Sequence, residues 1–229
     1  MTETTKTSAA KNSITEGTIW KQLLIFFFPI LLGTFFQQIY NTADAMVVGR
    51  FVGKEALACV GGSTAQIINL IVGFFVGLSS GATVVLAQYY GAKDENNVSR
   101  AMHTAAAFAI MGGLIITVLG IILTPQMLAL LNTPENLMEG SALYLRIYFA
   151  GAIFVFIYNI GSGLLRAVGD SKRPLYFLII CCCLNIILDL VLVVGAHMGV
   201  AGVAVGTFIS QGVSAILIII TLMRTKDMY

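Results

Sequence analysis

Six stretches of mostly apolar residues, each long enough to cross a lipid bilayer, occupy most of this 229-residue sequence. A helix that spans the bilayer needs about 20 such residues at a rise of about 1.5 Å per residue. The stretches cover residues 21–48, 63–87, 101–123, 140–165, 174–194 and 199–223. Charged residues make up 10% of the chain, against about 25% in a soluble globular domain. The sequence therefore predicts an all-α membrane protein whose six transmembrane helices leave little room for a soluble domain.

Positive charge is concentrated on one side of the predicted membrane domain. Ten of the 13 Lys and Arg residues lie before or at the start of the first span, after the last span, or in the connections after spans two and four. Because such residues are enriched in cytoplasmic loops, both termini are expected in the cytoplasm, with the chain crossing the cell (inner or plasma) membrane several times. Arg166, after span four, is expected to help fix how helices four and five meet the headgroups. The net charge of +2 gives no indication of a nucleic-acid partner.

The chain is expected to form one membrane lobe with short ends. Residues 1–18 are rich in Thr, Ser and Lys and lack the apolar core of a secretory signal, which predicts a disordered cytosolic tail. Residues 19–224 contain the six-helix transmembrane lobe, and residues 225–229 begin a cytosolic linker or tail.

Polar residues within the spans recur at helical spacing and so share one face of each helix. Four spans carry such a stripe: Gln37, Asn41 and Asp44; Ser63, Gln66 and Asn69; Asn185 and Asp189; Thr207, Gln211 and Ser214. Lipid would exclude these faces, so we expect them to share an interior cavity. A carboxylate at membrane depth costs about 2.5 to 3.5 kcal/mol on insertion scales. Asp44 and Asp189 therefore mark an ion or substrate path.

The two acids and the hydroxyl of Thr207 are expected at one depth, roughly 9 to 12 Å inside the outer boundary at 1.5 Å per residue. Two carboxylates, an amide oxygen and a hydroxyl suit a hard cation such as Na⁺. They equally suit a proton carrier, because neighbouring buried carboxyls titrate as a pair. A purely structural role for each acid within the bundle stays open. We find no nucleophile with a base, no metal-ligand spacing and no nucleotide loop, which argues against an enzyme.

Three backbone and aromatic features carry further expectations. Pro29, in the middle of span one, should kink the helix and acts either as a hinge or as a passive bend. Tyr144 and Tyr148 are expected in an interfacial belt near the outer boundary. Small-residue stripes let helices approach closely, and two are present: Gly73, Gly77 and Gly81; Gly202 and Gly206.

Several short motifs together carry a family resemblance. They are QQIYNTADAMVVG at 37–49, GKEALACVG at 53–61, AQYYGAKD at 87–94, YLRI at 144–147, LLRAVGDSKRP at 164–174, LNIILD at 184–189 and GVAGVAVGT at 199–207. In combination they resemble the MATE (multidrug and toxic compound extrusion) family, within a superfamily that includes flippases. The resemblance covers nearly everything after residue 18.

The resemblance implies an antiporter that exports organic cations and other amphipathic drug-like compounds by exchange with H⁺ or Na⁺, with no cofactor beyond that ion. It implies a cation-binding and coupling site in this lobe, formed by Asp44, Asn185, Asp189 and Thr207. It also implies that Pro29 is a hinge in the first helix. Weaker candidates to line the substrate path are Gln37, Tyr40 and Asn41.

The resemblance also raises a question of completeness. MATE proteins have twelve spans in two six-helix lobes, and this chain supplies the amino-terminal lobe only. Its partner is expected to be a missing second lobe or a second copy in a homodimer. Two alternative functions remain open: a non-transporting fragment or assembly module, and an exporter of lipid-linked or polysaccharide precursors from the same superfamily.

Overall fold

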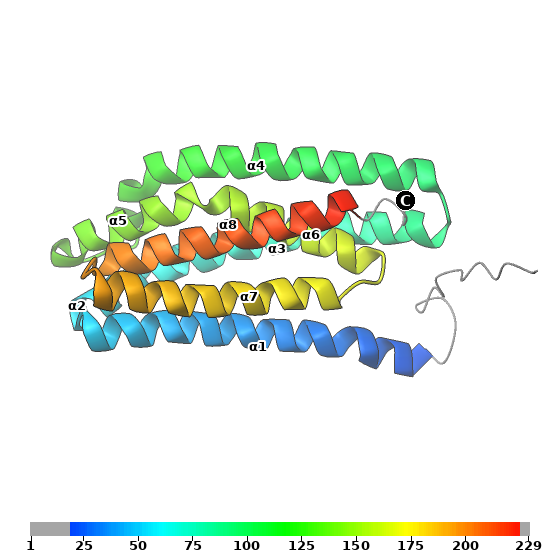
Figure 1. Cartoon of the computed structure of the whole chain (residues 1–229). Helices are drawn as coiled ribbons and strands as arrows, with labels where there is room; N and C mark the ends of the chain where they lie inside the picture. Colours follow the sequence, from blue (N-terminus) through cyan, green and yellow to red (C-terminus); the bar gives the residue numbers. More distant parts are fainter. Residues whose placement is uncertain (1–18, 225–229) are drawn as a thin grey trace, which may run out of the picture.

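The computed structural model describes residues 19–224, which form a bundle of long helices lying side by side (Figure 1). In chain order the elements are α1 (Ile19–Phe51), α2 (Lys54–Gly61), α3 (Ser63–Gly91), α4 (Glu95–Leu130), α5 (Glu135–Ala150), α6 (Ala152–Ala167), α7 (Lys172–Asp189), the π-helix η1 (Leu190–Gly195) and α8 (Val200–Arg224). The expected tail at residues 1–18 and the linker or tail at residues 225–229 lie outside the described residues.

Five helical segments of the described chain are long and apolar enough to cross a membrane: Leu23–Phe51, Lys54–Gly91, Glu95–Leu130, Lys172–Gly195 and Val200–Arg224. Helices α5 and α6 pass the same test together and meet at a bend of 47°, which gives up to six crossings. The predicted all-α, six-span lobe is therefore confirmed, but the fourth span is bent. At the bend, a Cβ atom on Gly151 would lie 3.1 Å from the ring of Phe208 on α8, so glycine allows α8 to pack closely there.

Helices α3, α4, α5 and α6 form one half of the bundle, which we call the packed half. Its core contains Phe75, Phe149 and Phe156, each at most 1% exposed. The rings of Phe75 and Phe156 stack with centroids 4.4 Å apart. Glycine brings the backbones together, because a Cβ on Gly113 of α4 would lie 2.9 Å from the Cα of Ile153 on α6. This half has the close packing typical of a protein interior.

Helices α1, α7 and α8 form the other half, which we call the hollow half. Helix α1 lies along α7, and α7 lies along α8 (Figure 1). In the most apolar 18-residue stretch of α1 only 6% of the residues are buried, against 44% in the corresponding stretch of α8. Helix α1 is thus held mainly through α7, and most of its apolar surface faces outward.

The predicted glycine stripes have opposite outcomes. On α3, a Cβ at Gly73, Gly77 or Gly81 would meet no atom within 4 Å, so the prediction of close helix packing there was wrong. The stripe lies on an exposed face, because α3 packs on α4 and α6 through its opposite side. On α8 the prediction is confirmed: a Cβ on Gly202 would lie 3.1 Å from Cγ2 of Val193.

The end of α7 changes its helical geometry. Directly after Asp189 the chain continues as η1, in which the N–H of Ala196 donates to the carbonyl of Val191, five residues earlier, at 2.9 Å. His197 and Gly199 then take positive φ values of 54° and 59° and turn the chain into α8. Single π-turns are frequent at functional sites, and this one begins at a buried acid.

Candidate functional site

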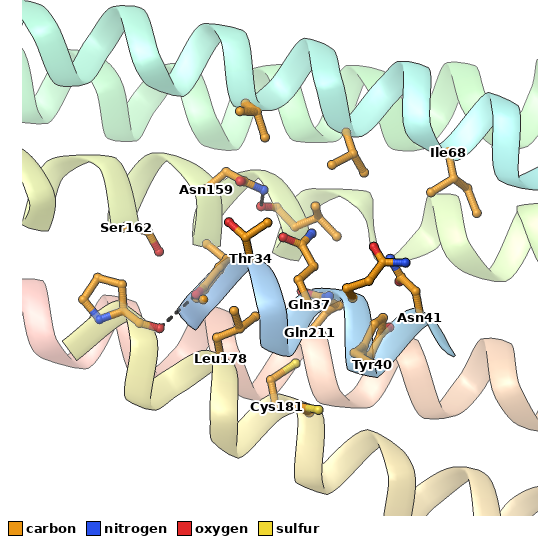
Figure 2. Close-up of a pocket in the computed structure, with 18 of the residues that line it drawn as sticks. Thr34, Gln37, Tyr40, Asn41, Ile68, Asn159, Ser162, Leu178, Cys181 and Gln211 are labelled. Atoms are coloured by element: carbon orange, nitrogen blue, oxygen red, sulfur yellow. Dashed lines mark hydrogen bonds between the residues drawn. The ribbon is translucent and has the colours of Figure 1, made fainter. Parts of the chain in front are cut away.

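A cavity of about 770 Å³ separates the two halves of the bundle. Its lining comes mainly from α1, α7 and α8 on one side and from α3, α5 and α6 on the other. Figure 2 shows Thr34 and Gln37 of α1 with Asn159 of α6 across from them. The lining on α1 extends from Pro29 to Ala45, which corresponds to roughly 24 Å of helix. Three of the four predicted polar stripes, on α1, α3 and α8, contribute residues to this shared cavity, as the sequence predicts.

The weaker path candidates Gln37, Tyr40 and Asn41 all line this cavity (Figure 2). Ser63 and Gln66 were expected to do the same and do not belong to its lining. Each step of three residues leaves the side chain about 60° away from the previous one around an α-helix, so Asn69 lies about 120° from Ser63 and the three do not share one narrow face. On α3 the cavity is reached by the face that includes Asn69.

Four predicted site residues lie together at one end of the cavity. Asp44 of α1 reaches the cavity wall, whereas Asn185 and Asp189 of α7 lie behind it, outside the lining and fully buried. The carboxyl of Asp44 is close enough to Asp189 and Asn185 to interact with both electrostatically. Thr207 of α8 is 3% exposed, and its hydroxyl lies beside that of Tyr40. Three helices thus bring oxygen-bearing side chains to one place.

The polar atoms of this cluster are buried without hydrogen-bond partners. They are Oδ1 of Asp44, both carboxyl oxygens of Asp189, both amide atoms of Asn185, Oγ1 of Thr207 and the hydroxyl of Tyr40. The carboxyls approach each other, but none of these pairs has hydrogen-bond geometry. A buried polar atom left unsatisfied costs about 1 to 3 kcal/mol, so native proteins keep few of them. Carboxylate, amide and hydroxyl oxygens are ligands suited to a hard cation, and two adjacent acids are also suited to a shared proton.

A small apolar cluster closes the cavity beyond the acids. Val48 and Val193 lie one helical turn past Asp44 and Asp189, and they pack with Val203 of α8. All three valines are at most 3% exposed. The acids are thus separated from the nearer end of the bundle by packed side chains, and this low-dielectric surrounding strengthens their electrostatic interactions.

Glycine at position 206 positions one of the acids. A Cβ on Gly206 would lie 2.6 Å from Oδ1 of Asp189, which is too close for any residue larger than glycine unless the carboxyl moves. Gly206 therefore allows α8 to approach the carboxyl and places Thr207, its neighbour in the chain, beside the acids. The sequence indicated close packing at Gly206 but not that its contact is the carboxyl of Asp189.

The prediction that Tyr144 and Tyr148 form an interfacial belt was wrong. Both line the cavity, and Tyr144 is 4% exposed and close enough to Asp44 and Thr207 to interact with them. The four-residue spacing places both rings on one face of α5, and that face turns toward the hollow half. Aromatic side chains near a predicted boundary fit either location, so the pattern alone could not distinguish them.

Sequence reasoning also missed a polar stripe on α6. Tyr158, Asn159, Ser162 and Arg166 all line the cavity. Their spacing is that of one helix face, so the signal used for the other spans was present here too. Pro29, the predicted hinge, is buried and lines the cavity within α1. Its role as a hinge stays a prediction.

Curated relatives of this chain are bacterial multidrug resistance proteins. The chain is 32% identical over 228 residues to the probable multidrug resistance protein YoeA of Bacillus subtilis (strain 168), covering 98% of this chain and 49% of that protein. It is 35% identical over 202 residues to the probable multidrug resistance protein YpnP of the same organism, covering 87% of this chain and 45% of that protein. The chain therefore spans about half the length of the curated relatives it matches.

The fold has a close counterpart among solved structures. It superposes on an outward-facing multidrug resistance MATE family transporter of the MOP superfamily with a TM-score of 0.89 and 25% identity, over 97% of this chain and 49% of that chain. The family model MatE matches residues 29–191, a range that contains Asp44, Asn185 and Asp189. On this evidence the chain belongs to the MatE family, whose members are MATE multidrug transporters and not enzymes.

Proposed function

We propose that this chain forms the cation-coupling lobe of an antiporter that exports organic cations and amphipathic drug-like compounds in exchange for H⁺ or Na⁺. One observation carries the proposal: Asp44 and Asp189 meet in a buried cluster, and within residues 19–224 neither acid forms a salt bridge. Two buried acids without a basic partner need a cation, either a proton or a metal ion, to balance their charge. A site of that kind suits ion coupling better than a structural role.

The four site residues take distinct roles in this proposal. Asp44 and Asp189 are the coupling carboxylates, and Asn185 and Thr207 supply neutral oxygen ligands. Because Asp44 is the acid at the cavity wall, a coupling cation and an organic cation in the cavity compete for its negative charge. Competition for one charge makes binding of the two cations mutually unfavourable, which exchange requires. Gln37, Tyr40 and Asn41 line the substrate path, and Pro29 lets the first helix bend.

The wider setting is part of the same proposal. The lobe lies in the cell (inner or plasma) membrane with both termini in the cytoplasm, because Lys and Arg residues concentrate on that side. Alternating access moves one repeat of a transporter against the other, so a single lobe needs a partner. We propose that a second six-helix lobe or a second copy of this chain covers the cavity from the side of α1.

Gradient-driven transport in liposomes tests the proposal. The purified protein is reconstituted, a pH gradient or a Na⁺ gradient is imposed, and the flux of a fluorescent organic cation is followed, with Asp44→Asn as the control. We expect flux that follows one of the two gradients and is lost in Asp44→Asn. The gradient that drives the flux identifies the coupling ion.

Two results would overturn the proposal. Flux that persists in both Asp44→Asn and Asp189→Asn with its gradient dependence intact would remove the acids from the coupling site. A correctly folded wild-type protein that moves no organic cation under either gradient, alone or with a second lobe supplied, would favour a non-transporting assembly module.

A further inference from the structure

The cavity lining contains two charged side chains, Asp44 and Arg166, at opposite ends. Asp44 lies beside Asp189, the last residue of α7. Arg166 lies in the last turn of α6 and interacts with Tyr158, whose hydroxyl donates to the carbonyl of Pro174 at 3.0 Å, in the first turn of α7. The helix from Pro174 to Asp189 covers roughly 22 Å. One end of the cavity is therefore acidic and the other is basic.

The guanidinium of Arg166 has no acidic partner among the described residues. The nearest acid in the chain, Asp170, is engaged by Arg173, through a 3.1 Å ion pair and a 3.1 Å hydrogen bond from the backbone N–H of Arg173. Ser162 lies one turn before Arg166 on the same face of α6. Ser162 is 2% exposed, and its Oγ lies beside the hydroxyl of Tyr158 but forms no hydrogen bond of good geometry. Figure 2 shows this hydroxyl directed toward the cavity.

The sequence predicted that Arg166 lies in the connection after span four and helps fix how helices four and five meet the headgroups, whereas the structure places it on α6, in the cavity wall. A cation in the last turn of a helix also complements the helix dipole. The dipole alone gives no reason for a cavity position or for the unpartnered hydroxyl one turn earlier. A guanidinium with a neighbouring hydroxyl is instead suited to a planar or tetrahedral oxyanion, which it binds through two parallel N–H donors.

We infer that Arg166 and Ser162 form an anion-binding subsite at the α6–α7 end of the cavity, which receives a carboxylate or phosphate group of the transported compound. The inference rests on the proposed function and narrows its substrate class. Compounds that carry an anionic group beside their cationic or apolar part are favoured over purely cationic ones. The subsite lies about 20 Å from Asp44 by helix length, so the anionic group of a substrate binds there without contacting the coupling carboxylates.

A matched pair of dyes tests the subsite. Rhodamine B carries a free carboxylate, and its ethyl ester has the same ring system without that charge. Binding of both dyes to the protein in phosphatidylcholine nanodiscs is measured by fluorescence anisotropy. For Arg166→Gln we expect the affinity for rhodamine B relative to the ester to fall about tenfold, the scale of a lost charge-assisted hydrogen bond. Ser162→Ala should give a smaller change in the same ratio, and Arg166→Lys should restore part of it.

The control variant is Arg100→Gln, which removes a positive charge from an exposed position on α4 outside the cavity. Its affinity ratio should equal that of the wild type. An equal loss for both dyes in Arg166→Gln, or an unchanged ratio, would overturn the inference. Thermal unfolding of each variant identifies a folding defect. If Arg166→Gln is misfolded, the affinity ratio of Arg166→Lys compared with that of the wild type tests the inference.

A lipid phosphate is the other source of such an anion, and a second arm separates it. Nanodiscs that contain phosphatidylglycerol replace those of phosphatidylcholine. If Arg166→Gln changes only the sensitivity to phosphatidylglycerol and not the dye ratio, the residues hold a lipid headgroup and the substrate subsite is refuted. Failure of the proposed function gives a different result. In that case Asp44→Asn would not change the flux of the ester, regardless of how Arg166→Gln changes the ratio of the two dye affinities.

Discussion

The packed half and the hollow half of this lobe are both built from apolar helices, but they treat buried polar atoms in opposite ways. In the packed half, Thr124 donates to the carbonyl of Gly120 at 2.6 Å and Ser79 donates to the carbonyl of Asn159 at 2.6 Å. In its four helices, the buried polar side-chain atoms that lack a hydrogen-bond partner are all hydroxyl oxygens. In the hollow half they include the carboxyls of Asp44 and Asp189.

The difference separates what holds the lobe together from what it binds. Close contacts of glycines with aromatic and aliphatic side chains fix the helices of the packed half relative to one another. The hollow half places Asp44 at the wall of the cavity, with Asn185 and Asp189 buried behind it. Substitutions at the glycine contacts of the packed half should therefore change stability, and substitutions at the acidic cluster of the hollow half should change transport.

The largest effect is expected from Asp189→Asn. The amide is close to the carboxyl in size but cannot carry the charge that a coupling cation needs, so gradient-driven flux should be lost. Removing an unpaired buried charge should leave the protein at least as stable. Flux in liposomes and thermal unfolding measure the two effects. The control is Asp170→Asn, outside the cavity; an unfolded Asp189→Asn protein would instead make this acid structural and break the contrast between the halves.

Gly206→Ala should have the next largest effect. The added methyl group would push the carboxyl of Asp189 away from Asp44, and a displacement of about 1 Å can reduce activity by roughly tenfold to a hundredfold. Gly212→Ala is the control on the same helix, because its Cβ would meet the ring of Phe154 at an ordinary 3.7 Å. Flux and ion dependence are compared for both variants. Equal activity in the two would show that the acid has room to move.

In the packed half, Gly113→Ala should destabilise the protein by about 1 to 3 kcal/mol through overpacking. Its Cβ would press on the backbone of Ile153, which cannot rotate away. Gly77→Ala on α3 meets nothing within 4 Å and should be neutral or slightly stabilising, since alanine favours helices. Thermal unfolding in detergent provides the comparison. If both substitutions destabilise equally, the exposed face of α3 packs against something beyond the described residues.

The smallest effect is expected from Pro29→Ala. Alanine restores a backbone N–H inside α1, so hydrogen exchange at residues 30–33 should slow and flux should fall severalfold if bending of α1 is part of transport. Pro125→Ala, inside α4 of the packed half, is the control and should leave flux unchanged. If hydrogen exchange slows but flux is unchanged, Pro29 bends α1 without acting as a hinge in transport.

The buried acidic cluster was predictable because charge is so rare in these spans. Asp44 and Asp189 stand out in an apolar sequence, and helical spacing assigns Asn185 to the face of Asp189. The contact of Gly206 with the carboxyl of Asp189 was not predictable, because it depends on how closely two helices approach. For the same reason the inward orientation of Tyr144 could not be read from the sequence.

The packing of the fold was less predictable than its spans. Length and hydropathy predict how many helices cross the membrane, but apart from a narrow polar stripe such helices are apolar on most sides, so composition does not tell which apolar side faces lipid and which packs on a neighbour. The stripe at Gly73 was therefore assigned to packing although it is exposed. The bend at Gly151 was missed, because glycine is common in membrane helices and does not by itself mark a break.

The π-helix after Asp189 has a consequence for how relatives of this chain should be aligned. A π-turn accommodates one residue more than an α-turn, so the segment Leu190–Gly195 has the form of a single-residue insertion that the helix absorbed without ending. Deleting one residue there would convert the π-turn into an α-turn and leave the residues up to His197 close to their present orientation relative to Asp189. A relative with a regular helix at this point needs a one-residue gap in the alignment within the segment, and an ungapped alignment would assign its residues to the wrong helix face.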